Sequence, residues 1–344
     1  MNQNYYLGVD ISKSKIDCAL IDAQFELLNE KEVANTDQKV AYFLTRLIRK
    51  LNINPSELLI CCENTGIYNR PLERVCQALG IKLWVEHPLK IKRASTDMRG
   101  KNDRKDAIRI AEYLARYKDK MATFQEPSEM VKELNYQVKI RETLLAQKAA
   151  IENQIREAES HDKEAFQAMK SGYKAVLKTI KASLMKTEAK IEEISKNEES
   201  LSENITLMKT IPGIGTQSAV NLVIATNNFS NFNSAKHLAC YAGVVPFQNQ
   251  SGTIIKKERI SKLANLKIKK LLHLAAMAAC KSDPQIKAYY IRKVKEGKNK
   301  MSVLNAIRNK LVHRIMAVIT RKTPYIKTIE DFYQNRNNNT CILT

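Results

Sequence analysis

Alternating apolar and polar positions near the N-terminus predict β-strands. The runs YYLGVD and IDCALID, within residues 5–22, flank the polar turn SKSK, and a third strand is expected around FELLNEKEV. Two later apolar runs, in SELLICCENTG and IKLWVEHP, have the length and composition of buried strands. The first of these two strands ends at Glu63.

Between and after these strands, apolar residues recur at the three- and four-residue spacing of helices. This spacing covers TDQKVAYFLTRLIRKLN, then NRPLERVCQALG, which closes at Gly80, and then DRKDAIRIAEYLARY. The order of elements is three strands, a helix, a strand, a helix, a strand and a helix. This order predicts an α/β domain with a mixed sheet over residues 1–125.

Residues 126–206 have a different pattern. The stretch 128–208 contains no proline and one glycine, Gly172, and its apolar residues recur at heptad spacing. We expect two long helices joined near MKSGYK as an antiparallel coiled-coil hairpin. Such a seam joins protomers into a dimer or tetramer, or it packs within its own chain; heptads do not decide between these alternatives.

The remainder of the chain predicts a mainly helical domain over residues 207–325 and a tail over 326–344. LMKTIPGIGTQSAVNLVIAT indicates a helix, a tight turn and a helix, and the turn resembles a helix-hairpin-helix. Gly213 and Gly215 would let backbone N–H groups approach a phosphate, although a tight interhelical turn also needs glycine. Helices are expected over SAKHLACYAGVVP, ANLKIKKLLHLAAMAAC and two segments within 284–320, with FQNQSGTIIKKERIS as a loop.

The charge of the chain points to a polyanionic partner. The net charge is +21, and residues 252–300 hold 14 Lys or Arg against three acids. DNA, RNA or a membrane surface could attract such charge. The sequence contains neither a basic amphipathic anchor nor an apolar run of about 20 residues, so a membrane is the least favoured of the three. The N-terminus lacks a signal-peptide layout, and the scattered cysteines indicate reduced thiols. We therefore expect a cytoplasmic, nucleoid-associated protein.

Four acids stand at positions where strands end or a helix begins. Asp10 follows the first apolar run, Glu63 ends a buried strand, and Asp103 and Asp106 open a helix. In a mixed sheet of this order, the first strand and LLICC should be neighbours, which brings Asp10 beside Glu63. A helix across the sheet can add the other two carboxylates. Crowded carboxylates repel unless a cation lies among them, and oxygen ligands favour Mg²⁺, with Mn²⁺ as the alternative. Each acid alone is also common at turns, strand ends and helix caps.

Three segments carry a family resemblance: YLGVDISKSKIDCALID, CCENTGIY and GKNDRKDA. They resemble the RNase H/RuvC-like nuclease fold and, more closely, the DEDD transposases of the IS-one-ten insertion-sequence family, which are related to Piv DNA invertases. The resemblance covers about residues 5–320. It implies a RuvC-like metal-binding domain, a coiled-coil linker and a C-terminal serine domain. It also implies that the four acids are the catalytic metal ligands.

The segment AGVVPFQNQSGTIIKKERISKLAN resembles the Gly-x-x-Pro, Ser-Gly and basic run of the same family. The resemblance implies that Ser251 is a nucleophile that forms a phosphoserine bond to DNA and meets the acids of its own or another protomer. From the residues alone, NQSGT is a polar turn, and a serine hydroxyl needs a base or metal for activation. Ser261 is the competing candidate, although we expect it to cap the helix beginning near Ala264.

Basic residues and turn glycines near both sets of catalytic candidates are expected to contact nucleic acid. They are Lys101, Arg104, Lys105, Gly213, Gly215, Lys256, Lys257, Arg259 and Lys262. No motif in the chain reads bases. The family resemblance implies that a structured bridge RNA instead pairs with donor and target DNA.

These observations predict a metal-dependent DNA transposase or recombinase with a serine nucleophile. Three alternatives stay open at this point: a Holliday-junction resolvase or nuclease without a serine intermediate, a site-specific DNA invertase, and a non-catalytic nucleic-acid-binding scaffold.

Overall fold

The computed structural model describes residues 5–94, 103–251, 254–261 and 263–326, with the backbone alone at 103 and 247–259. The chain divides into two compact units, Met1–Glu126 and Pro127–Thr344. Each unit has its own core and is described separately. In the described part of the chain, no helix combines the length and the apolar character needed to span a membrane.

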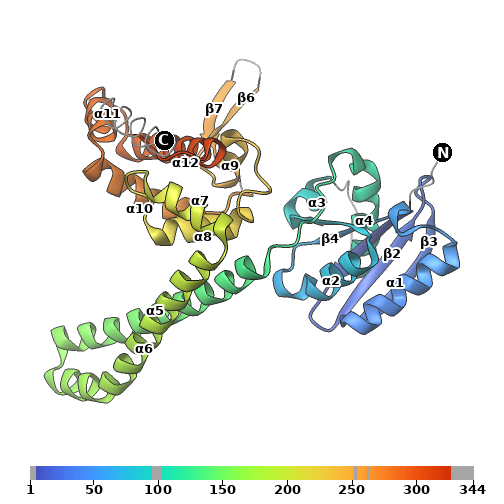
Figure 1. Ribbon diagram of the computed structural model, residues 1–344, viewed down its shortest axis with the longest axis horizontal. Helices are drawn as coiled ribbons and strands as arrows, with labels where there is room; N and C mark the ends of the chain where they lie inside the picture. Colours follow the sequence, from blue (N-terminus) through green and yellow to red (C-terminus); the bar gives the residue numbers. More distant parts are fainter. Residues whose placement is uncertain (1–4, 95–102, 252–253, 262, 327–344) are drawn as a thin grey trace, which may run out of the picture. The chain divides into compact units, whose positions relative to one another are not determined.

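The first unit is built on a five-stranded sheet with the order β3-β2-β1-β4-β5 (Figure 1). β1 (Tyr5–Ile11), β2 (Lys15–Ile21) and β3 (Leu27–Ala34) form an antiparallel meander. β4 (Leu58–Glu63) is parallel to β1, and β5 (Lys82–Glu86) is parallel to β4. The mixed sheet predicted from the sequence is confirmed, and β1 does adjoin the LLICC strand.

Helices cover both faces of this sheet. On one face, α1 (Asp37–Leu51) and α2 (Arg70–Leu79) bury side chains such as Leu44 and Leu72 against Val9 and Cys62. Arg74 on α2 donates two hydrogen bonds, of 2.8 and 2.7 Å, to the Asp37 carboxylate of α1. On the other face, α4 (Asp103–Arg116) and a short helix that the sequence did not predict, α3 (Pro88–Ala94), pack over a second core.

Gly8 is the point where α4 lies directly on the sheet. A methyl group at Gly8 would lie 2.1 Å from the Ala107 carbonyl oxygen and 2.3 Å from the Ala111 amide nitrogen. Only glycine leaves room for the backbone of a helix to approach a strand this closely. The contact therefore determines where the first turn of α4 lies relative to β1.

The second unit begins with a hairpin of two long helices, α5 (Glu129–His161) and α6 (Lys163–Asn197). The predicted junction near MKSGYK is wrong, because the helices meet at Asp162 instead. The Asp162 carboxylate accepts hydrogen bonds of 3.0 Å from the Glu164 and Ala165 amides, so it caps the start of α6. Gly172 lies within α6, where its low helix propensity is tolerated.

The predicted seam along the second helix is buried within the chain itself. Ile180, Leu184 and Ile191 of α6 are buried, and Arg141 of α5 pairs with Glu188 of α6 at 2.7 Å. The seam does not continue unbroken to Met208, because α6 ends at Asn197 and α7 (Glu199–Lys209) begins after Glu198. Oligomerisation through these helices stays a prediction.

The rest of the second unit is mainly helical, as predicted. It contains α8 (Thr216–Thr226), α9 (Ala235–Tyr241), α10 (Leu266–Ser282), α11 (Pro284–Lys295) and α12 (Lys300–Arg321). Ile307, Leu311 and Ile315 of α12 are fully buried in the core of this unit.

The segment expected to be a loop forms a hairpin instead. β6 (Phe247–Ser251) pairs antiparallel with β7 (Ile254–Arg259) (Figure 1). In this register, Ser251 is opposite Ile254. The β-branched Ile254 and Ile255 favour an extended backbone. The basic residues that follow them led the sequence pattern to predict a loop instead.

Candidate active site

Asp10 and Glu63 lie side by side at one edge of the sheet. The last paired residues of the parallel strands β1 and β4 are Val9 and Cys62, and each acid is the next residue of its strand. Neighbouring strands lie about 4.8 Å apart. Since side chains alternate along a strand, Asp10 shares the face of Gly8, which is the face that α4 covers.

Asp106 joins these two acids from α4. It precedes Ala107, whose carbonyl oxygen lies over Gly8, only two residues from Asp10. Burial raises the pKa of Glu63, the negative charges of Asp10 and Asp106 raise it further, and the positive charge of Arg109 opposes them. Three of the four predicted carboxylates are therefore close enough to influence one another.

Arg109 is a member of this cluster that the sequence analysis did not assign. Its Nη2 lies 2.5 Å from Asp106 Oδ1, and its Nε is buried with no hydrogen-bond partner among the described residues. The spacing of three residues between Asp106 and Arg109 on one helix was the available signal. The pair balances one negative charge in a site that otherwise gathers them.

The other residues predicted near this cluster are less fully described. Asp103 is the first residue of α4, one turn before Asp106, and its side chain lies outside the described part. Arg104 and Lys105 are exposed on α4, and Lys101 lies outside the described residues. Within the described ranges, no three His, Cys, Asp or Glu side chains are grouped closely enough to hold a metal ion.

The chemistry of the cluster nevertheless suits a divalent cation. Its donors are carboxylate oxygens, which are the preferred ligands of Mg²⁺ and Mn²⁺. Burial and mutual repulsion already raise the pKa of Glu63, and a cation would relieve both costs. The residues that would hold it are Asp10, Glu63 and Asp106, with Asp103 from the same helix turn.

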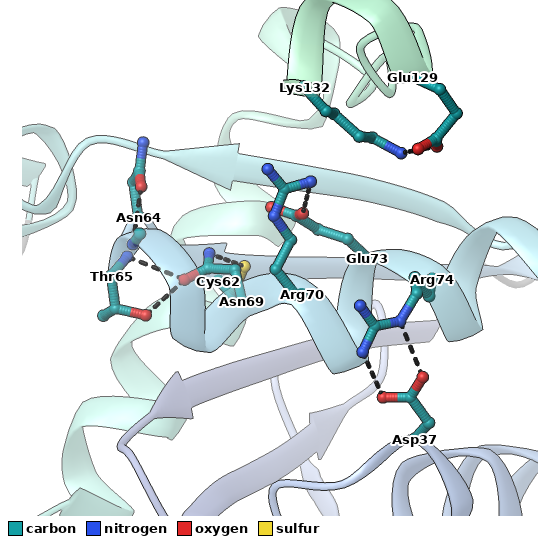
Figure 2. A network of polar contacts seen from close by, with 11 residues as sticks. Asp37, Cys62, Asn64, Thr65, Asn69, Arg70, Glu73, Arg74, Glu129 and Lys132 are labelled. Carbon is teal, nitrogen blue, oxygen red and sulfur yellow. Dashed lines mark hydrogen bonds and ion pairs between the residues drawn. The ribbon is translucent and has the colours of Figure 1, made fainter. Parts of the chain in front are cut away.

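Asn69 supports the turn that follows Glu63, and Figure 2 shows its contacts with Thr65 and Cys62. The Asn69 side chain is 1% exposed, and its Nδ2 donates to the Glu63 carbonyl oxygen at 2.9 Å. Its Oδ1 accepts hydrogen bonds from the backbone amide, at 2.9 Å, and from the hydroxyl of Thr65. Asn69 therefore holds the turn that follows β4, although nothing in the one-dimensional pattern set it apart from other turn asparagines.

Two further acids on this face already have partners. Glu86 is opposite Glu63 in the sheet and accepts hydrogen bonds from the His87 amide at 2.7 Å and the Tyr113 hydroxyl at 3.2 Å, besides pairing with Lys90 at 3.0 Å. Asp17 is opposite Asp10, and Lys15 lies 3.3 Å from its carboxylate. These contacts make both acids structural.

The predicted nucleophile lies in the second unit. Ser251 is the last residue of β6, and Lys256, Lys257 and Arg259 lie on β7. Their side chains, and all of Lys262, lie outside the described part. Ser261 does not cap a helix as expected, because α10 is capped by Asn265, and the Ser261 hydroxyl accepts from the Leu263 amide at 3.1 Å.

The two turn glycines have different surroundings. Gly213 has φ +92°, and a methyl group there would lie 2.4 Å from the Ala275 carbonyl oxygen of α10, so helix packing requires this glycine. Gly215 is the N-cap of α8, and no atom would approach such a methyl group within 4 Å. Only Gly215 therefore offers an open helix N-terminus to a phosphate.

Family models match both units. A model described as "Transposase", for the DEDD domain of IS110 elements, matches residues 7–158. A model described as "Transposase IS116/IS110/IS902 family" matches residues 205–291. The first match contains the four predicted acids, and the second contains Ser251 and both turn glycines.

The chain is also similar to several known proteins. The Pilin gene-inverting protein of Moraxella bovis is 27% identical over 331 residues, which cover 95% of this chain and 99% of that protein. An uncharacterized protein of insertion element IS110 from Streptomyces coelicolor is 29% identical over 119 residues, which cover 35% of this chain and 29% of that protein. A solved chain, T. thermophilus RuvC in complex with Holliday junction substrate, aligns at 10% identity and a TM-score of 0.28, covering 35% of this chain and 98% of that one.

The first unit thus has a mixed sheet within the region that matches the DEDD transposase model, and the mainly helical second unit contains the second match. The protein belongs to the IS110/IS116 family of insertion-sequence transposases, the IS-one-ten family that its motifs resemble.

Proposed function

We propose that this transposase cuts and exchanges DNA strands through a phosphoserine intermediate at Ser251. In this proposal Asp10, Glu63, Asp103 and Asp106 hold Mg²⁺, with Mn²⁺ as an alternative. The observation that carries the proposal is the meeting of three acids from β1, β4 and α4 at one sheet edge. The DEDD fold itself implies a divalent metal.

The residues of the acidic site have separable roles. A bound divalent cation polarises a phosphodiester and stabilises the charge that develops on its oxygens. The sheet positions Asp10 and Glu63, and α4 positions Asp106, so the three carboxylates come from elements that pack against one another. Arg109, which pairs with Asp106 at 2.5 Å, supplies positive charge where the phosphate arrives.

The covalent step is a transesterification, which conserves the energy of the broken phosphodiester bond. The Ser251 Oγ attacks a backbone phosphorus, the Oγ–P bond forms, and the bond from phosphorus to one sugar oxygen breaks. The serine proton ends on the released sugar oxygen, which becomes a hydroxyl group. A second DNA hydroxyl can later displace the serine, so strands are exchanged without ATP.

The partners follow from charge and family. Residues 252–300 hold 14 Lys or Arg and only three acids, and this positive charge supports contacts to DNA phosphates. Such contacts position a duplex without reading its base sequence. We propose that a bridge RNA provides sequence recognition and that the helical hairpin brings protomers together. Recovery of one discrete structured RNA with the protein purified from the cytoplasm of its host would support guidance of recombination by RNA. Absence of such an RNA would contradict this guidance.

A denaturing gel with labelled DNA tests the nucleophile. The wild-type protein should give a denaturant-resistant adduct that requires Mg²⁺, and Ser251→Ala and Asp10→Asn should give none. Ser261→Ala is the matched control and should retain the adduct. An adduct that persists in Ser251→Ala would show that Ser251 is not the nucleophile. If that variant cuts DNA without any adduct, the protein is a metal-dependent nuclease or resolvase.

A site-specific invertase is the second candidate. The Moraxella bovis relative named Pilin gene-inverting protein matches 95% of this chain, which favours this alternative. Inversion uses the same covalent chemistry but requires two inverted sites on one DNA molecule. Recombination on such a plasmid, with no insertion into separate target DNA, would support inversion. Recombination that survives Asp10→Asn would instead support a scaffold role.

A further inference from the structure

The second unit contains a pocket that none of the preceding roles explains. It has a volume of about 950 Å³ and lies between α10, α12 and the base of the β6–β7 hairpin. Pro246 and Ile260, the residues that flank the hairpin, form part of its wall. Arg308 of α12 and Lys269 of α10 also line it.

Arg308 is a buried cation without a carboxylate partner in the described part of the chain. The Arg308 residue is only 5% exposed. Its Nη2 lies 3.0 Å from His273 Nδ1, its Nη1 donates to Asn305 Oδ1 at 3.4 Å, and its Nε is buried with no partner. A guanidinium stays charged in proteins, and a buried charge without a counterion is costly.

No acid in the described part of the chain compensates this charge, and Lys269 is a second cation in the pocket wall. Burial lowers the pKa of Lys269, and the charge of Arg308 lowers it further. The same two causes, in the same order, lower the pKa of His273, so this ring is kept neutral and can accept from Arg308. No ion pair joins Lys269 or Arg308 to an acid within the described residues. The pocket is therefore built to receive an anion.

We propose that this pocket binds a phosphodiester group of the DNA strand that Ser251 attacks. This inference rests on the proposed function for the identity of the strand. Arginine binds phosphate oxygens through its planar fork, and lysine adds a point charge. The hairpin that carries Ser251 starts at the pocket, which favours DNA over RNA as the occupant.

The length of β6 gives the register of the contact. Pro246 and Ser251 are five residues apart, which is roughly 16 Å of extended strand. The phosphates of B-form DNA wind around the helix axis besides rising along it, so this length places the bound phosphate within a few nucleotides of the one attacked. The pocket would thus hold the strand while Ser251, at the far end of β6, reaches the scissile bond.

The test compares Lys269→Gln with Lys270→Gln in the full-length protein. Lys270 is the adjacent, exposed residue of α10 and is absent from the pocket, so it controls for the loss of one charge. Inorganic phosphate, added at constant ionic strength, should raise the melting temperature of the wild-type protein and the control, and much less that of Lys269→Gln. An equal rise in the melting temperature of all three proteins would contradict phosphate binding in this pocket.

Salt-dependent DNA binding identifies the occupant. Lys269→Gln should reduce the slope of log K against log salt by about 0.9 on duplex DNA, the value for one lost phosphate contact, and Lys270→Gln should not. A change confined to RNA binding would overturn the DNA assignment. Arg308→Gln should weaken DNA binding while leaving the ligand-free melting temperature unchanged or higher, because it removes an uncompensated charge. Absence of the Ser251 adduct would refute the proposed function but leave the phosphate result interpretable.

Discussion

Replacing Gly8 with alanine should move the helix that carries Asp106. The new methyl carbon would lie 2.1 Å from the Ala107 carbonyl oxygen and 2.3 Å from the Ala111 nitrogen, whereas ordinary contact begins at 3.4 Å. Both clashing atoms belong to the backbone of α4, so no side-chain rotation can relieve them. The helix must retreat by about 1.3 Å, the difference between 3.4 and 2.1 Å.

This displacement has two measurable consequences. Overpacking of a well-filled core costs about 1–3 kcal/mol of folding free energy. Asp106 directly precedes Ala107, so its carboxylate shifts away from Asp10 and Glu63 by a similar distance. A misplacement of about 1 Å at a catalytic site can reduce the rate about 100-fold. We therefore expect a folded variant with lower stability and a much slower covalent reaction.

Denaturant unfolding followed by circular dichroism measures the first effect, and the rate of protein–DNA adduct formation with Mg²⁺ measures the second. Gly172→Ala is the control, since Gly172 lies within α6 and no described atom lies within 4 Å of the position that its new methyl group would take. That change should be neutral or stabilise the helix by about 0.5–1 kcal/mol. A Gly8→Ala protein with wild-type stability and adduct rate would refute the reasoning.

Two further predictions concern Glu63 and its support. Because the pKa of Glu63 is raised in the folded state, its charge destabilises the metal-free protein above that pKa. Glu63→Gln should therefore have a higher melting temperature than the wild type at pH 7. This difference in melting temperature should vanish as the pH falls to 4.5, the unperturbed pKa of a glutamate. An equal melting temperature at pH 7 in chelator would contradict this. Asn69→Ala should lose about 2–4 kcal/mol in denaturant unfolding, because it removes buried hydrogen bonds to the turn after β4, whereas exposed Asn64→Ala should lose less than about 1 kcal/mol. Equal losses would contradict the role of Asn69.

The sequence predicted the sheet edge well because the relevant signals are local. Alternation defined the strands that end near Asp10 and Glu63, and the apolar stripe of the following helix placed Asp106 on its first turn. Adjacency of the two strands followed from rules of mixed-sheet topology.

Other features depended on contacts that no local pattern encodes. The close approach at Gly8 requires the backbone of a helix almost 100 residues later, and Asn69 matters only through the carbonyl and turn that it holds. The junction at Asp162 was missed because glycine in MKSGYK seemed the stronger break, although an aspartate cap starts a helix more decisively than an interior glycine ends one. Burial of Arg308 likewise emerges only when α10 and α12 pack.

Divalent metal binding tests the central claim most directly. Titration of the metal-free full-length protein with Mn²⁺, followed by electron paramagnetic resonance of the free ion, reports binding without any need for catalysis. We expect saturable binding by the wild-type protein and by Ser251→Ala. The affinity should be at least about 10-fold weaker in Glu63→Gln, which removes one charged oxygen ligand. Equal Mn²⁺ affinity in the wild-type and Glu63→Gln proteins would contradict a metal site at the edge where β1, β4 and α4 meet.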